Sequence, residues 1–249
     1  MGTNKSTLVL IFLICNAFPG CIFSDESGES FDLVIDYSSL NGTIVQKYSD
    51  GIIQSTENVM IEFDFSPTKT ELLTIGVDVN DGTEPVVSSV SESSLKVVVE
   101  FTSHGKYNLS VYAISTNNVK QTLEIPIIIE LRIDWTEEST NEPKPLQFDP
   151  SPKNGGEHPL MIEIESEVTN PSVLDDFSGG QSVQFSWTVT DELGDTCQRN
   201  SAEVSDGASE TWETIHFNTY LIHDLTVVYE DGQDLIDVNQ TVWIVYGTD

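Results

Sequence analysis

Basic residues are scarce in this sequence. It has 10 Lys and Arg residues against 41 Asp and Glu residues, a formal net charge of −31 over 249 residues. Such a surface repels phosphate groups, which excludes nucleic acids as partners. The acidic residues are scattered rather than gathered in runs, as on a solvated surface. A hydrophobic content of 38% is still enough for packed cores, so the chain is not expected to be disordered as a whole.

Catalytic motifs are also missing. The sequence has no GxSxG, no HExxH, no phosphate-binding loop and no dinucleotide fingerprint. No CxxC pair or Cys/His spacing indicates zinc. Of the four histidines, His216 and His223 flank a six-residue segment and could lie near each other, but the sequence names no third ligand for them. We therefore expect a protein that is not an enzyme and has no cofactor, with calcium as the one open alternative.

Cysteine is scarce, and two of the three cysteines lie near the N-terminus. Residues 1–20 are typical of a signal peptide, because Lys5 precedes an apolar run over residues 7–18 that is too short to span a membrane. Residues 21–30, CIFSDESGES, are small, polar and acidic, which predicts a flexible tether. We expect an exported protein of the cell envelope or cell surface, either membrane-tethered or secreted.

The stretch FPGC at residues 18–21 resembles the lipobox of prokaryotic lipoproteins. Gly20 and Cys21 match that pattern, whereas the two residues before them depart from it. The resemblance implies a lipid anchor at Cys21, through which the protein would contact the membrane. Two alternatives remain open. Ordinary cleavage after Gly20 would leave Cys21 and Cys197 able to form a disulfide, and an uncleaved apolar run would be an N-terminal anchor.

Beyond the tether, hydrophobic and polar residues alternate along short runs. Examples are VMIEFDF at 59–65, LKVVVEF at 95–101 and YNLSVYA at 107–113. This period of two predicts strands with one buried and one exposed face, separated by turns such as SDG and NDG. Pro126 predicts an edge or a bulge in its strand. Since no long amphipathic helix is present, we predict an all-β fold of two tandem antiparallel β-sandwiches.

A proline-rich segment predicts the boundary between the two sandwiches. Residues 136–159 hold five of the ten prolines and a Gly pair, and no apolar period continues through them. We interpret them as a semi-rigid linker. The first β-sandwich domain is then expected over residues 31–135 and the second over residues 160–249.

The segment IGVDVNDGTEPVV at 75–87 resembles a PKD-type domain, whose signature is an aromatic strand running into Gly-Asp-Gly-Thr. Residues 80–83 match the turn, but the expected Trp is absent and Gly76 lies nearby. The segment GGQSVQFSWTVTDELGD resembles Ig-like prokaryotic surface domains. These resemblances imply an extracellular spacer or a module that binds a protein or a carbohydrate. The alternative is a substrate-recognition part of an exported enzyme or transporter system, for a carbohydrate or peptide.

Several residues are candidates for modification or ligand binding. Four residues with hard oxygen atoms are candidate calcium ligands and lie close together in one turn: Asp78, Asn80, Asp81 and Glu84. The alternative interpretation is a polar turn capped by Asx side chains, without calcium. Three asparagines begin N-x-Ser/Thr sequons and are candidate glycosylation sites: Asn41, Asn108 and Asn239. Trp187, Trp212 and Trp243 are candidates for a sugar-stacking platform, but Trp187 is in phase with core residues, and Trp212 is the one we expect to be exposed.

Overall fold

The computed structural model describes residues 30–90, 94–172, 180–232 and 235–247, and their regular structure consists of β-strands. The all-β fold predicted from the alternating pattern is confirmed. Within the described ranges, no helix is long and apolar enough to cross a membrane. Cys21 and the rest of the expected signal peptide and tether up to residue 29 lie outside them.

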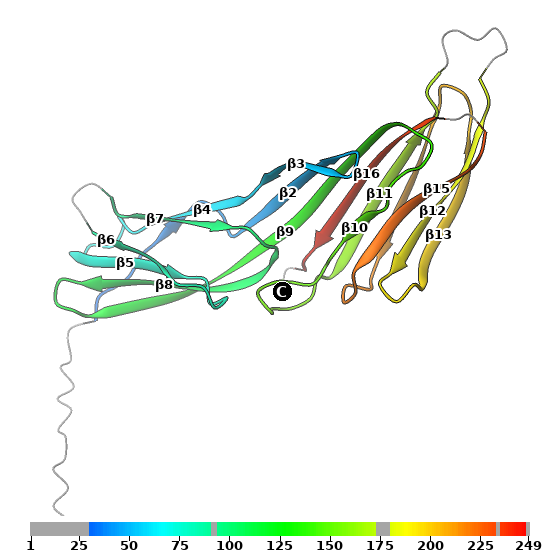
Figure 1. Cartoon of the computed structure of the whole chain (residues 1–249). Coiled ribbons are helices and arrows are strands. Elements are labelled where there is room, and N and C mark those ends of the chain that lie inside the picture. The colour runs from blue at the N-terminus through cyan, green and yellow to red at the C-terminus, as the bar shows by residue number, and fades with distance from the viewer. Residues whose placement is uncertain (1–29, 91–93, 173–179, 233–234, 248–249) are drawn as a thin grey trace, which may run out of the picture.

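One large sheet runs through the molecule (Figure 1). Its main path has the strand order β14-β11-β16-β9-β8-β5-β6, and β2 and β3 join it beside β9. The strands of this sheet are β2 (Asn41–Ser49), β3 (Ile52–Glu57), β5 (Leu72–Asp78), β6 (Val86–Ser89), β8 (Gly105–Ser115), β9 (Lys120–Thr140), β11 (Met161–Thr169), β14 (Ser209–His216) and β16 (Ile236–Val245).

Two smaller antiparallel sheets complete the fold. The three-stranded sheet consists of β1 (Asp36–Tyr37), β4 (Val59–Asp64) and β7 (Lys96–Phe101). The four-stranded sheet consists of β10 (Leu146–Phe148), β15 (His223–Asp231), β12 (Val183–Asp191) and β13 (Thr196–Val204). Figure 1 shows the first over the N-terminal half of the large sheet and the second over its C-terminal half.

The hydrophobic cores lie between the sheets, which makes each half a β-sandwich. In the first half, Phe101 of β7 meets Tyr107 of β8 edge to face, with ring centroids 5.1 Å apart. In the second half, the fully buried Trp187 of β12 donates its indole N–H to Ser166 Oγ of β11 over 2.8 Å. The two partners in each contact come from opposite sheets. Along the strands, buried and exposed residues alternate as predicted, for instance throughout β7 and β8.

Strand β9 runs through both sandwiches and pairs along both of its edges. One edge pairs with β8 over residues 120–129 and then with β16 over residues 131–140. The other edge pairs in parallel with β2 over residues 128–136. Leu131, for example, has Ile244 of β16 on one side and Ile44 of β2 on the other. A single strand therefore carries the hydrogen-bond ladder from one sandwich into the other.

Pro126 lies in β9 where one edge of the strand is open among the described residues. It pairs with Asn108 of β8 on its other side, and β2 begins its pairing only at Ile128. The Ile128 N–H points to this open side and donates to Leu40 O over 3.0 Å. The nitrogen of Pro126, two residues earlier, faces the same way, so the missing N–H removes no bond to β8.

Two parts of segment 136–159 lie in strands, although the sequence predicts a linker there. Residues 136–140 continue β9, and residues 146–148 form β10. The apolar pattern misses the end of β9 because Glu137 fills its buried position. This residue is 3% exposed, and its Oε1 accepts hydrogen bonds from Trp135 Nε1 and from a backbone N–H, both over 3.0 Å. One buried cluster also takes side chains from both halves. The division into two domains stays a prediction.

Replacing Trp187 by Ala should lower the free energy of unfolding by about 3–5 kcal/mol, because the change leaves a cavity in the second core and removes the indole N–H that donates to Ser166 Oγ. Denaturant unfolding measures this loss. The matched control is Leu193→Ala, since Leu193 is 73% exposed in a turn and should change stability by no more than about 0.5 kcal/mol. Equal losses in the two variants would contradict this placement of Trp187.

Candidate functional site

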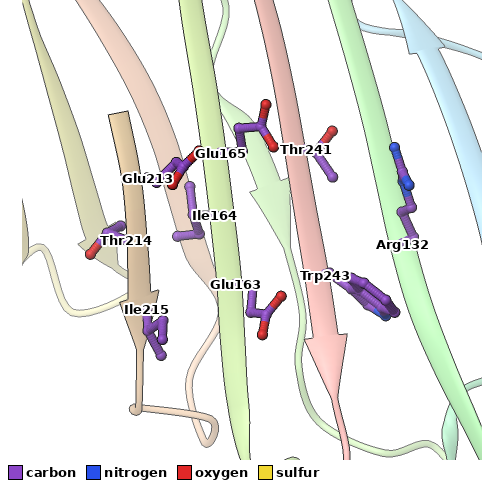
Figure 2. Close-up of a pocket in the computed structure, with 9 residues that line it drawn as sticks. All are labelled: Arg132, Glu163, Ile164, Glu165, Glu213, Thr214, Ile215, Thr241 and Trp243. Atoms are coloured by element: carbon purple, nitrogen blue, oxygen red, sulfur yellow. The ribbon is translucent and has the colours of Figure 1, made fainter. Parts of the chain in front are cut away.

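A solvent-open hollow of about 530 Å³ lies on the outer face of the large sheet, over β14, β11, β16 and β9 (Figure 2). We call it the outer groove. Its lining residues are Arg132, Glu163, Ile164, Glu165, Glu213, Thr214, Ile215, Thr241 and Trp243.

The alternation along the strands decides which side chains reach the outer groove. On β11 the buried Ile162 places its neighbour Glu163 on the outer face, and on β16 the buried Ile244 does the same for Trp243. The antiparallel register then sets Glu163, Trp243 and Arg132 in one row across three adjacent strands. Figure 2 shows these three side chains following one another from β11 to β16 to β9.

A carboxylate holds Trp243 in place. The indole N–H donates to Glu130 Oε2 over 3.0 Å, and Glu130 lies on β9 at the residue between its ladders with β8 and β16. Burial raises the pKa of Glu130, hydrogen bonds from the Tyr246 backbone and from Trp243 oppose that rise, and the charge of Glu163 adds to it. Because the bond restricts rotation of the indole, the groove contains a preorganised aromatic surface.

Carboxylates dominate the electrostatics of the outer groove. Glu165 and Glu213 are direct cross-strand neighbours, and like charges in such a pair repel each other. Glu163 adds a third carboxylate, and Arg132 is the basic residue in the lining. The Arg132 Nε already donates to Asp134 Oδ1 over 2.7 Å. The groove therefore favours ligands that donate hydrogen bonds or carry positive charge, and it disfavours anions.

One of the three tryptophans considered for a sugar platform lines the outer groove. Trp187 is fully buried, as predicted. The prediction that Trp212 is exposed is wrong, because its side chain is half-buried and its ring centroid lies 5.9 Å from that of Trp187. Trp243 is the tryptophan that lines the groove. The sequence predicts that Glu163 and Glu165 point outward. It could not predict that they lie beside Trp243, because the register between two strands cannot be read from the pattern of either strand alone.

The candidate calcium ligands lie around the turn after β5, and their oxygen atoms bind the turn itself. Asp78 Oδ1 accepts the Asn80 N–H over 2.9 Å, and Asp81 Oδ1 accepts the Thr83 N–H and hydroxyl over 2.9 and 2.6 Å. Asn80 has a φ of 56° and donates its side-chain amide to a backbone carbonyl of β8 over 2.6 Å. Glu84 is exposed beside them. This geometry is that of the Asx-capped turn, and calcium binding there stays a prediction.

The sequon asparagines are accessible to solvent. The exposed residues are Asn41 at the start of β2, Asn108 on β8 and Asn239 on β16. The outward position predicted for Asn108 is confirmed. Asn239 lies on the same face of β16 as Trp243. Glycosylation of the three stays a prediction.

No family model matches the chain, and no curated protein matches it. Solved structures with some likeness include carbohydrate-binding modules of the β-sandwich superfamily, at 7% identity, 89% of this chain, 99% of that chain and a TM-score of 0.31. Clostridium thermocellum CbhA fibronectin(III)-like modules have 10% sequence identity and a TM-score of 0.26, and the match covers 79% of this chain and 92% of that chain. Bacteroides uniformis beta-glucuronidase has 9% sequence identity and a TM-score of 0.29, and the match covers 84% of this chain and 30% of that chain. The PKD-type and Ig-like resemblances stay predictions.

Replacing Glu130 by Gln should raise the melting temperature at neutral pH. Because the pKa of Glu130 is raised in the folded state, its ionisation opposes folding as the pH rises above its unfolded pKa of about 4.3. Gln resembles the protonated acid, so the gain should be present at about pH 7 and absent at about pH 4. Thermal unfolding at the two pH values measures it. Glu138→Gln, at an exposed position of the same strand, is the control. A lower melting temperature for Glu130→Gln at neutral pH would contradict this account.

Proposed function

We propose that this chain is a non-catalytic, exported binding module whose outer groove binds a neutral or basic carbohydrate. The observation that carries the proposal is the Trp243 indole, fixed by Glu130 and flanked by carboxylates on a sheet face. The proposal extends the sequence-based expectation of an extracellular module with a protein or carbohydrate partner.

The chemistry of the groove matches that of a sugar ring. A pyranose has apolar C–H faces that stack on an aromatic ring, and hydroxyl groups around its rim that donate hydrogen bonds. Trp243 supplies the ring, and Glu163 and Glu165 supply acceptors on the adjacent strand. Thr241, the neighbour of Glu165 on β16, adds a hydroxyl that both donates and accepts.

Charge narrows the class of carbohydrate. Three carboxylates line the groove against one guanidinium, and the whole chain carries a formal charge of −31. Uronic acids, sialic acids and sulfated sugars would be repelled. Neutral hexoses avoid this repulsion, and an amino sugar would gain an ion pair with the Glu165 and Glu213 pair.

The position of the site suits a long ligand. The groove crosses four strands of one sheet and is open to solvent, so a chain of sugars could continue beyond it in either direction (Figure 2). The ladder fixes the backbones of these strands, which reduces the ordering entropy lost on binding. With the signal segment and acidic tether expected from the sequence, such a module would act outside the cell, at the envelope or in the medium.

Replacing Trp243 by Ala should weaken carbohydrate binding by about 30-fold, the effect of losing a hot-spot aromatic worth about 2 kcal/mol. The test first screens the full chain on an array of neutral, amino and acidic glycans. It then measures the dissociation constant of the best soluble oligosaccharide by titration calorimetry. The matched control is Tyr37→Ala, since Tyr37 is an exposed aromatic residue on β1, away from the groove.

Three results would contradict the proposal. One is an array on which acidic glycans bind best, because the groove charge opposes them. Another is a Trp243→Ala variant that binds as tightly as the parent while Tyr37→Ala does not. Failure of every glycan to bind would also reject the carbohydrate assignment.

A further inference from the structure

Four strand ends of the second sandwich meet at one place, and each brings a side chain with metal-binding chemistry. Asp191 ends β12, Cys197 is the second residue of β13, His216 ends β14 and His223 begins β15. Asp191 and His223 are cross-strand partners in the four-stranded sheet. β14 belongs to the opposite, large sheet, so the group forms between the two sheets at one end of the sandwich.

A β-bulge turns Cys197 toward this group. Between β12 and β13 the register pairs Val189 with Gln198 and Thr190 with Thr196, which leaves Cys197 as the extra residue without a partner. A bulge residue departs from the strict alternation of its strand, and bulges often re-aim a side chain beside a functional site. The Cys197 Sγ lies 3.7 Å from the backbone oxygen of Asp195.

The two histidines face each other through the nitrogen atoms that ordinarily bind metals. His216 Nε2 and His223 Nε2 are 3.0 Å apart, and the side chains are 6% and 1% exposed. His223 Nδ1 is buried without a hydrogen-bond partner. In a hydrogen bond between the two rings, one Nε2 must donate its proton and the other must accept it with its lone pair.

We propose that Cys197, His216 and His223 bind one Zn²⁺ ion. The Sγ atom and one ring nitrogen of each histidine all lie within 4.8 Å of one another. A zinc ion placed among them needs ligand distances of about 2.3 Å to sulfur and 2.0–2.1 Å to nitrogen, so small side-chain rotations are enough to close the site. No other group of three such ligands is found in the described ranges.

Neighbouring atoms favour zinc over calcium or copper. Thiolate and imidazole are borderline-soft ligands that calcium does not use. Asp191 Oδ2 lies 4.0 Å from Cys197 Sγ, which offers an oxygen ligand, or a partner for a bound water, at the fourth position. A copper site of the Cys/His₂ type uses a weak axial thioether or carbonyl instead of a carboxylate. Cys197 is also exposed to solvent, where Cu²⁺ would oxidise its thiolate and Zn²⁺ would not.

Neighbouring groups fix the positions of Asp191 and His223 beside the proposed zinc site. Asp191 Oδ1 accepts the backbone N–H groups of Leu193 and Asp195, each over 3.0 Å, which fixes the carboxylate beside Cys197. The ring of His223 stacks on Phe148, with centroids 5.5 Å apart. On zinc binding, the Cys197 thiol loses its proton to solvent and its thiolate forms the Zn–S bond, while the two imidazoles bind as neutral ligands.

Zinc would join the two sheets of the second sandwich. Cys197 and His223 belong to the four-stranded sheet, whereas His216 belongs to the large sheet. The ion would also close the loop of residues 217–222 between the two histidines, which carries the exposed Phe217 and Tyr220. The site would therefore stabilise this end of the sandwich and fix the conformation of that loop.

Cobalt titration of the metal-stripped full chain tests the proposal, because Co²⁺ replaces Zn²⁺ and its thiolate complexes absorb visibly. We expect one equivalent of Co²⁺ to produce tetrahedral d–d bands and a sulfur-to-metal charge-transfer band, and Zn²⁺ to displace it. Excess Zn²⁺ should raise the melting temperature by about 5 °C or more. Cys197→Ser should abolish the charge-transfer band, and His216→Gln should abolish the tetrahedral bands.

Cys21→Ser serves as the control, because it removes another thiol of the full chain and should keep the bands and the thermal shift. The metal-free melting temperature of Cys197→Ser should equal that of the parent, since this side chain is exposed. The proposal would be overturned by the absence of a stoichiometric band, by loss of the band in Cys21→Ser instead of Cys197→Ser, or by failure of Zn²⁺ to displace Co²⁺.

Discussion

Strand β9 pairs along both of its edges, and this pairing joins the two sandwiches. On one edge, β8 and β16 follow each other end to end, and on the other edge β2 spans the point where they meet. The large sheet is therefore part of both sandwiches. The single residue between the two ladders, Glu130, keeps its polar side chain on the outer face, where it binds the Trp243 indole. The constraint that joins the halves thus also shapes the proposed ligand site.

The two proposed sites use the same sheet in different ways. The outer groove uses side chains that the strand alternation directs to solvent, and its position depends on register across β11, β16 and β9. The Cys197, His216 and His223 group uses residues at strand ends, brought together by a bulge and by the packing of two sheets. The groove would bind a ligand on a rigid surface, and the metal would stabilise the sandwich edge nearby.

The sequence predicts the strands much better than it predicts the sites. Alternation identifies the buried face of most strands and correctly places Trp187 in the core, because burial leaves a local pattern of period two. It misses the end of β9, where the buried position is occupied by Glu137. It places Trp212 wrongly because burial there depends on packing against Trp187. The third ligand beside the two histidines, Cys197, lies at a bulge, which an alternating pattern cannot locate.

Hydrogen–deuterium exchange along residues 120–140 tests the claim that β9 is one continuous strand. The structure predicts slow amide exchange that continues from the stretch paired with β8, through residues 131–136, into Glu137, because those residues are paired with β16 and, up to residue 136, also with β2. Protection over residues 121–129 together with exchange at the rate of an unstructured peptide from residue 136 onward would contradict the claim. The segment would then be a linker between two independent domains.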